Sequence, residues 1–138
     1  MSWKTEEAKK IFAQGFNCSQ AVLSVFCEEY GMKKEQALKV ACGFGGGMRS
    51  GEICGAVSGA VMVVGLKYGT DKQLCYQKTV EFRNAFQEKN TSIICRNLLG
   101  YDISTEDGME QAKQKGLFQT TCVDMIVDAV CILEKLEY

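Results

Sequence analysis

The residues with the most chemical potential in this sequence are its eight cysteines, at positions 18, 27, 42, 54, 75, 95, 122 and 131. The chain contains no histidine, which excludes a Ser-His-Asp triad, a Cys-His pair and histidine ligation of zinc or haem within it. So many cysteines in a small chain with no export signal indicate metal or redox chemistry before structural disulfides. No two of them form a C-x-x-C pair, which argues against a thioredoxin-type motif and a zinc ribbon.

Four of the cysteines are predicted to lie in the first turns of helices. Asn17 is a typical N-cap residue, and Gln20 completes a capping box around Cys18. The caps expected for the other three are Ser50 or Gly51, Thr91 with Ser92, and Thr120 with Thr121. Free N–H groups and the helix dipole stabilise a thiolate at such positions. The candidate catalytic and metal-ligating residues, called here the helix-start cysteines, are therefore Cys18, Cys54, Cys95 and Cys122, and Cys54 is expected to be the most reactive.

The remaining cysteines are predicted to be packing residues. Cys27, Cys75 and Cys131 are expected well inside helices, and Cys42 at the end of one. A free cysteine commonly behaves as a small buried hydrophobic side chain. Replacing Cys27, Cys75 or Cys131 should therefore change stability while any redox activity or bound metal remains.

A glycine-rich segment, CGFGGGMRSGEICGAVSG at 42–59, precedes the second helix-start cysteine. It lacks the lysine of a phosphate-binding Walker loop, and neither register of G-x-G-x-x-G is complete. A tightly turned connector that brings Cys54 to the reactive centre is the favoured interpretation. The candidate cofactor-contacting residues are Gly45, Gly46, Gly47 and Arg49. For Arg49, binding an anion or supplying charge beside Cys54 competes with a plain solvent-facing position.

The elements that must position these residues are predicted to be helices of one domain spanning 1–138. The chain contains no proline, and apolar residues recur at helical spacing in most segments. Helices are expected at about 3–14, 18–29, 33–42, 52–68, 71–89, 92–99, 105–115 and 121–136. The β-branched residues of 52–68 would also fit a buried strand, but small residues four apart favour a helix there. The expected fold class is an all-α bundle with a glycine-rich loop.

Composition also limits the partners. The net charge of −1 comes from interspersed charges, so no nucleic-acid partner is expected. The apolar run at 53–66 is shorter than the roughly 20 residues of a membrane span, and the charged N-terminus does not resemble a signal peptide. A cytoplasmic location is therefore expected. The small-residue face at 55–60 would suit a close contact within the chain or in a homodimer.

The cysteine pattern resembles the C_GCAxxG_C_C family, described as redox-active proteins of about this length. The family pattern has one cysteine, a central motif and two further cysteines, which here correspond to FNCSQAV, CGAVSG at 54–59, IICRNLLG and TTCVDMIV. The family name writes glycine before the central cysteine, whereas Cys54 here precedes Gly55. The segment FGGGM at 44–48 also looks like the family. The resemblance implies redox roles for the helix-start cysteines and none for the other four. The family is similar to part of the split-Soret cytochromes, but C-x-x-C-H is absent here, so covalent haem is not expected.

Three functions remain open from the sequence, and with them whether the chain is an oxidoreductase or an electron-transfer protein. The first is a redox site in which the helix-start cysteines ligate an iron–sulfur cluster or another metal. The second is metal-free thiol–disulfide exchange with an unidentified redox partner. The third is a non-catalytic helical domain, held by a four-cysteine zinc site or simply containing buried cysteines.

Overall fold

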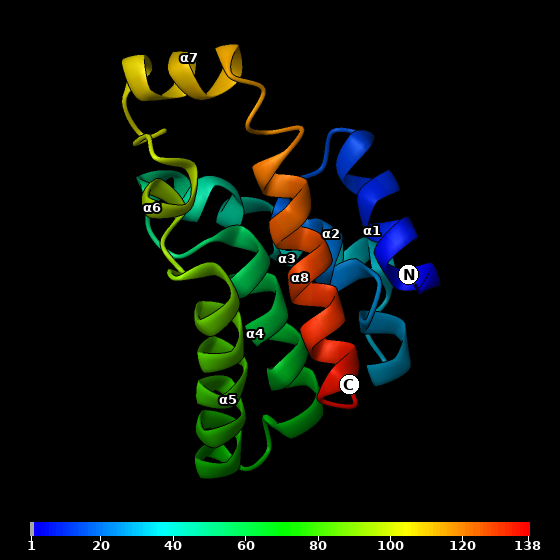
Figure 1. Cartoon of the computed structure of the whole chain (residues 1–138). Helices are drawn as coiled ribbons and strands as arrows, with labels where there is room; N and C mark the ends of the chain where they lie inside the picture. Colours follow the sequence, from blue (N-terminus) through cyan, green and yellow to red (C-terminus); the bar gives the residue numbers. More distant parts are fainter. Residues whose placement is uncertain (1) are drawn as a thin grey trace.

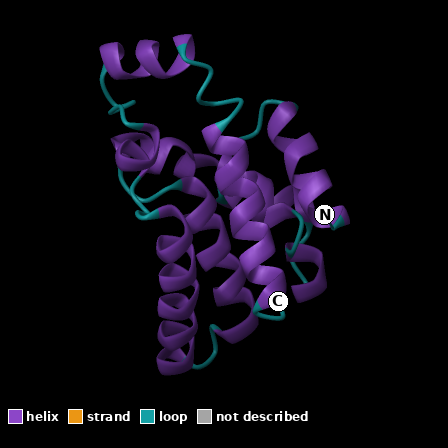
Figure 2. Cartoon of the chain, viewed as in Figure 1, coloured by secondary structure: helices purple, strands orange, loops and turns teal. Residues whose placement is uncertain are grey.

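The computed structural model describes residues 2–138 and contains only helices and loops (Figures 1 and 2). The long helices are α1 (Trp3–Ala13), α4 (Gly55–Tyr68), α5 (Lys72–Asn90) and α8 (Thr121–Lys135). Shorter ones are α2 (Cys18–Ser24), α3 (Lys34–Val40), α6 (Cys95–Leu99) and α7 (Glu106–Gln114). Three single-turn segments complete the chain: η1 (Cys27–Tyr30), η2 (Cys42–Phe44) and η3 (Gly47–Gly51). The predicted all-α fold is confirmed, including the helical assignment of 55–68.

Two features of the N-terminal helices differ from the prediction. The helix expected over 18–29 ends at Ser24. After it the chain makes a tighter turn, in which the N–H of Phe26 donates to the carbonyl of Leu23, three residues back. Phe26 and Cys27 are both fully buried, and this tighter turn is what brings the two neighbouring side chains into the core. Trp3, at the start of α1, departs from the expectation that apolar residues at helical spacing face the core, because it is 66% exposed.

The core of the bundle surrounds α4, which packs against α2, α5 and α8 (Figure 1). Its largest fully buried side chains include Phe82 and Phe86 of α5 and Ile126 and Leu133 of α8. Seven residues of α4 are buried, with almost no polar face between them. A helix that is apolar all round belongs in the interior of a bundle, which explains why its composition resembled a buried strand.

Small residues in α4 allow α2 to approach closely. A Cβ atom added at Gly59 would lie 2.6 Å from the carbonyl oxygen of Ser19, and one added at Gly55 would lie 3.3 Å from Cβ of Cys18. No larger side chain fits at Gly59 unless the backbone of α2 moves. The small-residue face predicted at 55–60 therefore makes a contact within the chain, and this contact brings the start of α2 beside the start of α4.

The segment containing α6 and α7 lies at one end of the bundle, beyond the start of α4 (Figure 1). It forms a second, smaller apolar cluster of Cys95, Leu99, Ile103 and Ala112, against which Cys122 also packs. Within residues 2–138, no helix has both the length and the apolar character needed to cross a membrane.

Candidate functional site

All four helix-start cysteines lie where helices begin, as predicted. Cys18 is the first residue of α2, and Asn17 and Gln20 form the expected capping box with bonds of 3.0 and 2.8 Å. Cys95 is the first residue of α6 and Cys122 the second of α8. Cys54 is itself the N-cap residue of α4, so neither Ser50 nor Gly51 has the predicted capping role.

The caps of the other two helices also differ from the prediction. Ile94, not Thr91 or Ser92, is the N-cap residue of α6. Thr120 occupies the N-cap position of α8, but its hydroxyl donates to the carbonyl of Gly116 instead of capping the helix. The sequence thus located the helix starts correctly, while the local hydrogen bonds that define them are different.

A short antiparallel pairing, which the sequence analysis missed, places two of the cysteines together. Ile53 and Ile94 form an isolated β-bridge. The N–H of Cys54 donates to the carbonyl of Ile93 at 2.7 Å, and the N–H of Cys95 donates to the carbonyl of Glu52 at 2.6 Å. The starts of α4 and α6 are therefore held side by side. The available signal was a β-branched residue immediately before each cysteine.

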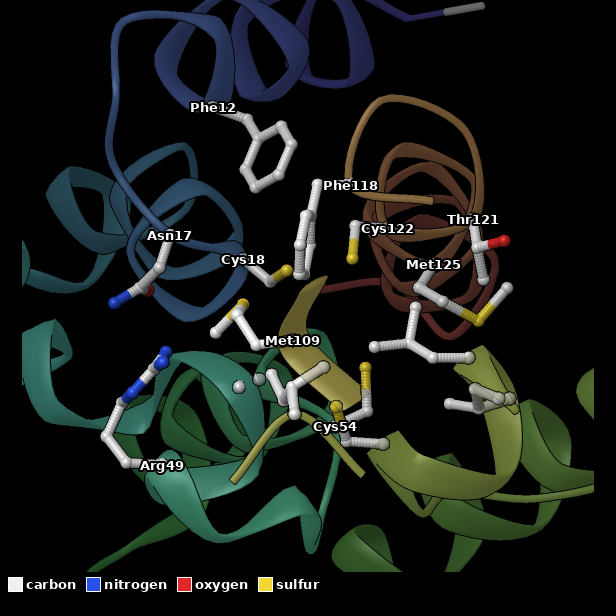
Figure 3. Close-up of a pocket in the computed structure, with 16 residues that line it drawn as sticks. Phe12, Asn17, Cys18, Arg49, Cys54, Met109, Phe118, Thr121, Cys122 and Met125 are labelled. Carbon is white, nitrogen blue, oxygen red and sulfur yellow. The ribbon is translucent and has the colours of Figure 1, made fainter. Parts of the chain in front are cut away.

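The four helix-start cysteines line a single pocket of about 130 Å³ (Figure 3). None of the other four cysteines lines it. Most of the remaining wall is apolar and comes from α1 and the segment 98–118, including Phe12, Leu98, Leu99, Ile103, Met109 and Phe118. Residues far apart in the sequence thus meet at the end of the bundle where α2, α4, α6 and α8 begin.

The other cysteines occupy varied positions. Cys27 is fully buried but begins η1, so the prediction that it lies well inside a helix is wrong. Cys42 begins η2 and does not end α3, and because it is exposed the prediction that it is a packing residue is also wrong. Cys75 and Cys131 lie inside α5 and α8 as expected, and both are half-buried.

Burial dominates the acidity of two pocket thiols. Removal from water raises the pKa of Cys54 to about 11, although N–H groups of Ala56 and Val57 at the start of α4 act in the opposite direction. Burial and the neighbouring charges of Cys54 and Cys122 raise the pKa of Cys95 to about 12, against a smaller lowering by Arg49. The predicted helix-terminus effect is therefore present at Cys54, but desolvation outweighs it. This direction is opposite to the expectation that Cys54 is the most reactive thiol.

Cys18 and Cys122 form an interacting pair. A side-chain hydrogen bond with Cys122, together with burial, raises the pKa of Cys18 well above its usual range. The same hydrogen bond lowers the pKa of Cys122, with burial opposing it. Their sulfur atoms face one another from α2 and α8 in Figure 3. The two pKa values therefore move in opposite directions because the Cys18 thiol can donate to a thiolate at Cys122.

The glycine-rich segment contains an unusual left-handed turn. Four consecutive residues have positive φ angles: Gly46 at 64°, Gly47 at 63°, Met48 at 58° and Arg49 at 57°. Non-glycine residues adopt this conformation only singly in most proteins, at a cost of about 1–2 kcal/mol each. The predicted tight turn is present, and Arg49 is its last residue.

Of the four candidate cofactor-contacting residues, Gly46 and Arg49 line the pocket, whereas Gly45 and Gly47 do not. The latter two are needed for packing. A Cβ atom at Gly45 would meet the side chain of Asn17 at 2.7 Å, and one at Gly47 would lie 2.4 Å from the backbone nitrogen of Glu52. They keep the loop against the starts of α2 and α4.

As a donor set, four thiols without histidine match a four-cysteine zinc site or an iron–sulfur cluster. Their placement does not match, because no group of three or more Cys, Asp or Glu side chains in the part of the chain described could hold a metal ion. All eight cysteines are free thiols. The described residues as they stand do not form a metal site.

The fold and the pocket define a small helical protein with a buried group of converging thiols. The sequence model of a family described as "Putative redox-active protein (C_GCAxxG_C_C)" matches residues 16–136. The chain belongs to this family. No curated protein and no solved structure gives a significant match.

Proposed function

We propose that this chain is a thiol–disulfide redox protein whose reactive pair is Cys122 and Cys18. The observation that carries the proposal is that these two thiols point towards one another in a pocket that all four helix-start cysteines line, and that each affects the acidity of the other. Cys122 has the lowered pKa of a nucleophile and is the less buried of the two. Cys18 is positioned to act second, as the resolving thiol.

The proposed reaction uses a disulfide, RSSR, as the oxidant. The Cys122 thiolate attacks one sulfur, which forms a mixed disulfide and releases the first RS⁻. Cys18 then attacks the sulfur of Cys122, loses its proton to solvent and releases the second RS⁻. Two protein thiols are oxidised to one disulfide, and RSSR is reduced to two RSH after protonation. The reverse sequence oxidises two RSH molecules to RSSR and reduces the protein disulfide to two thiols.

Cys54 and Cys95 have a different role in this proposal. Their raised pKa values keep them protonated at neutral pH, so neither competes with Cys122 for the substrate. Neutral thiols also make the pocket less polar than ionised ones would. Both remain reduced while the Cys18–Cys122 pair cycles.

The decisive experiment is peptide mapping of the protein after oxidation by a small disulfide, without reduction. The expected product is one peptide pair linked through Cys18 and Cys122, with loss of two titratable thiols. Cys122→Ser should abolish the linkage. Cys131→Ser, which removes a thiol of the same helix outside the pocket, should leave it intact. An oxidised protein in which Cys18 and Cys122 remain free would refute the proposal.

A second candidate is ligation of an iron–sulfur cluster or zinc by the four helix-start cysteines. The convergence of four thiols on one pocket favours it. It requires the sulfurs to move closer together than they are here. Iron, sulfide and zinc analysis after anaerobic purification separates the candidates: stoichiometric metal lost in Cys54→Ser and retained in Cys131→Ser supports ligation. Absence of metal together with the Cys18–Cys122 disulfide supports exchange.

A further inference from the structure

Arg49 is a cation presented to the thiol pocket. The left-handed turn at 46–49 ends at this residue, and its side chain lines the pocket together with Gly46 and Asn17. In Figure 3 the guanidinium extends from the glycine-rich loop towards the side of the pocket where Asn17 lies. Arg49 also acts on the pocket electrostatically, because its charge lowers the pKa of Cys95 against the larger effect of burial.

The charge of Arg49 has no partner within the described residues. None of the ion pairs there includes it, and its one hydrogen bond is a long contact of 3.4 Å to the carbonyl of Gly45. Arg96, on the neighbouring α6, is by contrast held by Glu52 at 2.6 Å. Arg49 is an exposed residue, so its guanidinium lies at the solvent-facing edge of this largely apolar pocket. A guanidinium in that position without a carboxylate partner is an open site for an anion.

The size and lining of the pocket define the rest of the ligand. Its volume of about 130 Å³ is slightly below the roughly 150 Å³ of an apolar cavity that binds benzene. Side chains such as Phe118, Leu98 and Ile103 line the pocket and offer apolar contacts. A compact body of about six non-hydrogen atoms fits, whereas a flavin or a dinucleotide does not.

We infer that the pocket binds small organic acids, with the carboxylate on Arg49 and a compact apolar body beside the thiols. This acid site rests on the proposed function, and together they give the substrate class as small disulfides that carry a carboxylate. Such a molecule places its sulfur beside Cys122 when its acid group is held by the arginine.

Binding is tested first with probes that cannot react with thiols. Benzoate, benzyl alcohol and benzylamine share an aromatic body and differ in charge, and their affinities for the reduced protein are compared by NMR titration. Benzoate is expected to bind about tenfold to a hundredfold more tightly than benzyl alcohol, and benzylamine most weakly. Arg49→Gln should remove this preference. Arg83→Gln, an exposed arginine of α5 outside the pocket, should keep it. Equal binding of benzoate and benzyl alcohol would overturn the inference.

Reactivity is tested with 3,3′-dithiodipropionate and 2-hydroxyethyl disulfide, which are anionic and neutral. The anionic disulfide should oxidise the wild-type protein about tenfold to a hundredfold faster, and Arg49→Gln should equalise the two rates. If benzoate binds through Arg49 but neither disulfide oxidises the protein, the acid site stands and the dithiol function is refuted. If both disulfides react equally and benzoate does not bind, the dithiol function stands and the acid site is refuted.

Discussion

Replacing Gly59 by alanine should push α2 away from α4 and destabilise the protein. The added Cβ would lie 2.6 Å from the Ser19 carbonyl oxygen and 3.1 Å from the Ser19 Cα, and both are backbone atoms that cannot rotate aside. Overpacking of this kind costs about 1–3 kcal/mol. Alanine regains up to about 1 kcal/mol because it is a better helix former than glycine. The net expectation is a loss of about 1–2 kcal/mol in the free energy of unfolding.

The matched control is Gly65→Ala in the same helix, where an added Cβ meets nothing within 4 Å. There the helix propensity acts alone, and a gain of about 0.5–1 kcal/mol is expected. Urea denaturation followed by circular dichroism measures both variants. Their unfolding midpoints should differ by roughly 1 M, because small proteins lose about 1–3 kcal/mol per molar urea. If Gly59→Ala is as stable as Gly65→Ala, the close contact of α2 with α4 is not what requires glycine at this position.

Four further predictions concern thiols and one buried hydroxyl. Iodoacetamide should label Cys122 of the reduced protein well before Cys54, because a pKa of about 11 leaves roughly one Cys54 thiol in ten thousand ionised at pH 7. Equal labelling rates of the two thiols in timed mass spectra would contradict the choice of Cys122 as nucleophile. The free energy of unfolding should fall as the pH rises from about 9 to 11, since the unfolded chain loses the Cys54 proton near pH 8.5 and the folded protein retains it to about pH 11. The loss from this thiol is roughly 3 kcal/mol, and Cys54→Ala should show a shallower pH dependence in denaturation experiments. Tyr138→Phe should raise the thermal midpoint and increase the free energy of unfolding by about 1 kcal/mol, because the Tyr138 hydroxyl is buried without a hydrogen-bond partner in the described structure. A lower midpoint would show that the hydroxyl does stabilise the fold. Cys27→Ala should cost about 1–2 kcal/mol because its side chain is fully buried, while the number of thiols that a small disulfide oxidises stays the same.

The sequence predicted the helices well where capping and periodicity act locally. The Asn17–Gln20 capping box fixed the start of α2, and the small residues of α4 correctly indicated a helix in close contact with another. The early end of α2 was not predictable in the same way. It depends on burying Phe26 and Cys27 together, which is a property of the assembled core and not of local spacing.

The site was predictable as a set of residues but not as an arrangement. The sequence placed four cysteines at helix starts, although only Asn17 caps its helix in the predicted way. Their convergence depends on the pairing of Ile53 with Ile94 and on the packing of Gly59 against Ser19, both of which join segments distant in sequence. The relative acidity of the thiols could not be predicted, because burial opposes the helix dipole and its extent is known only from the fold.

The separate apolar cluster of the α6–α7 segment has a kinetic consequence. A segment with its own small cluster can detach from the bundle at a lower free energy than global unfolding requires. Because the segment contributes much of the pocket wall, each such event admits reagents to the buried thiols. The rate at which Cys54 is modified should therefore become independent of reagent concentration once the reagent reacts with the exposed thiol faster than the segment closes again. The limiting rate would equal the opening rate constant of 95–118. It should match the exchange rate of the backbone amide protons there when that exchange is measured at a pH where every opening leads to exchange.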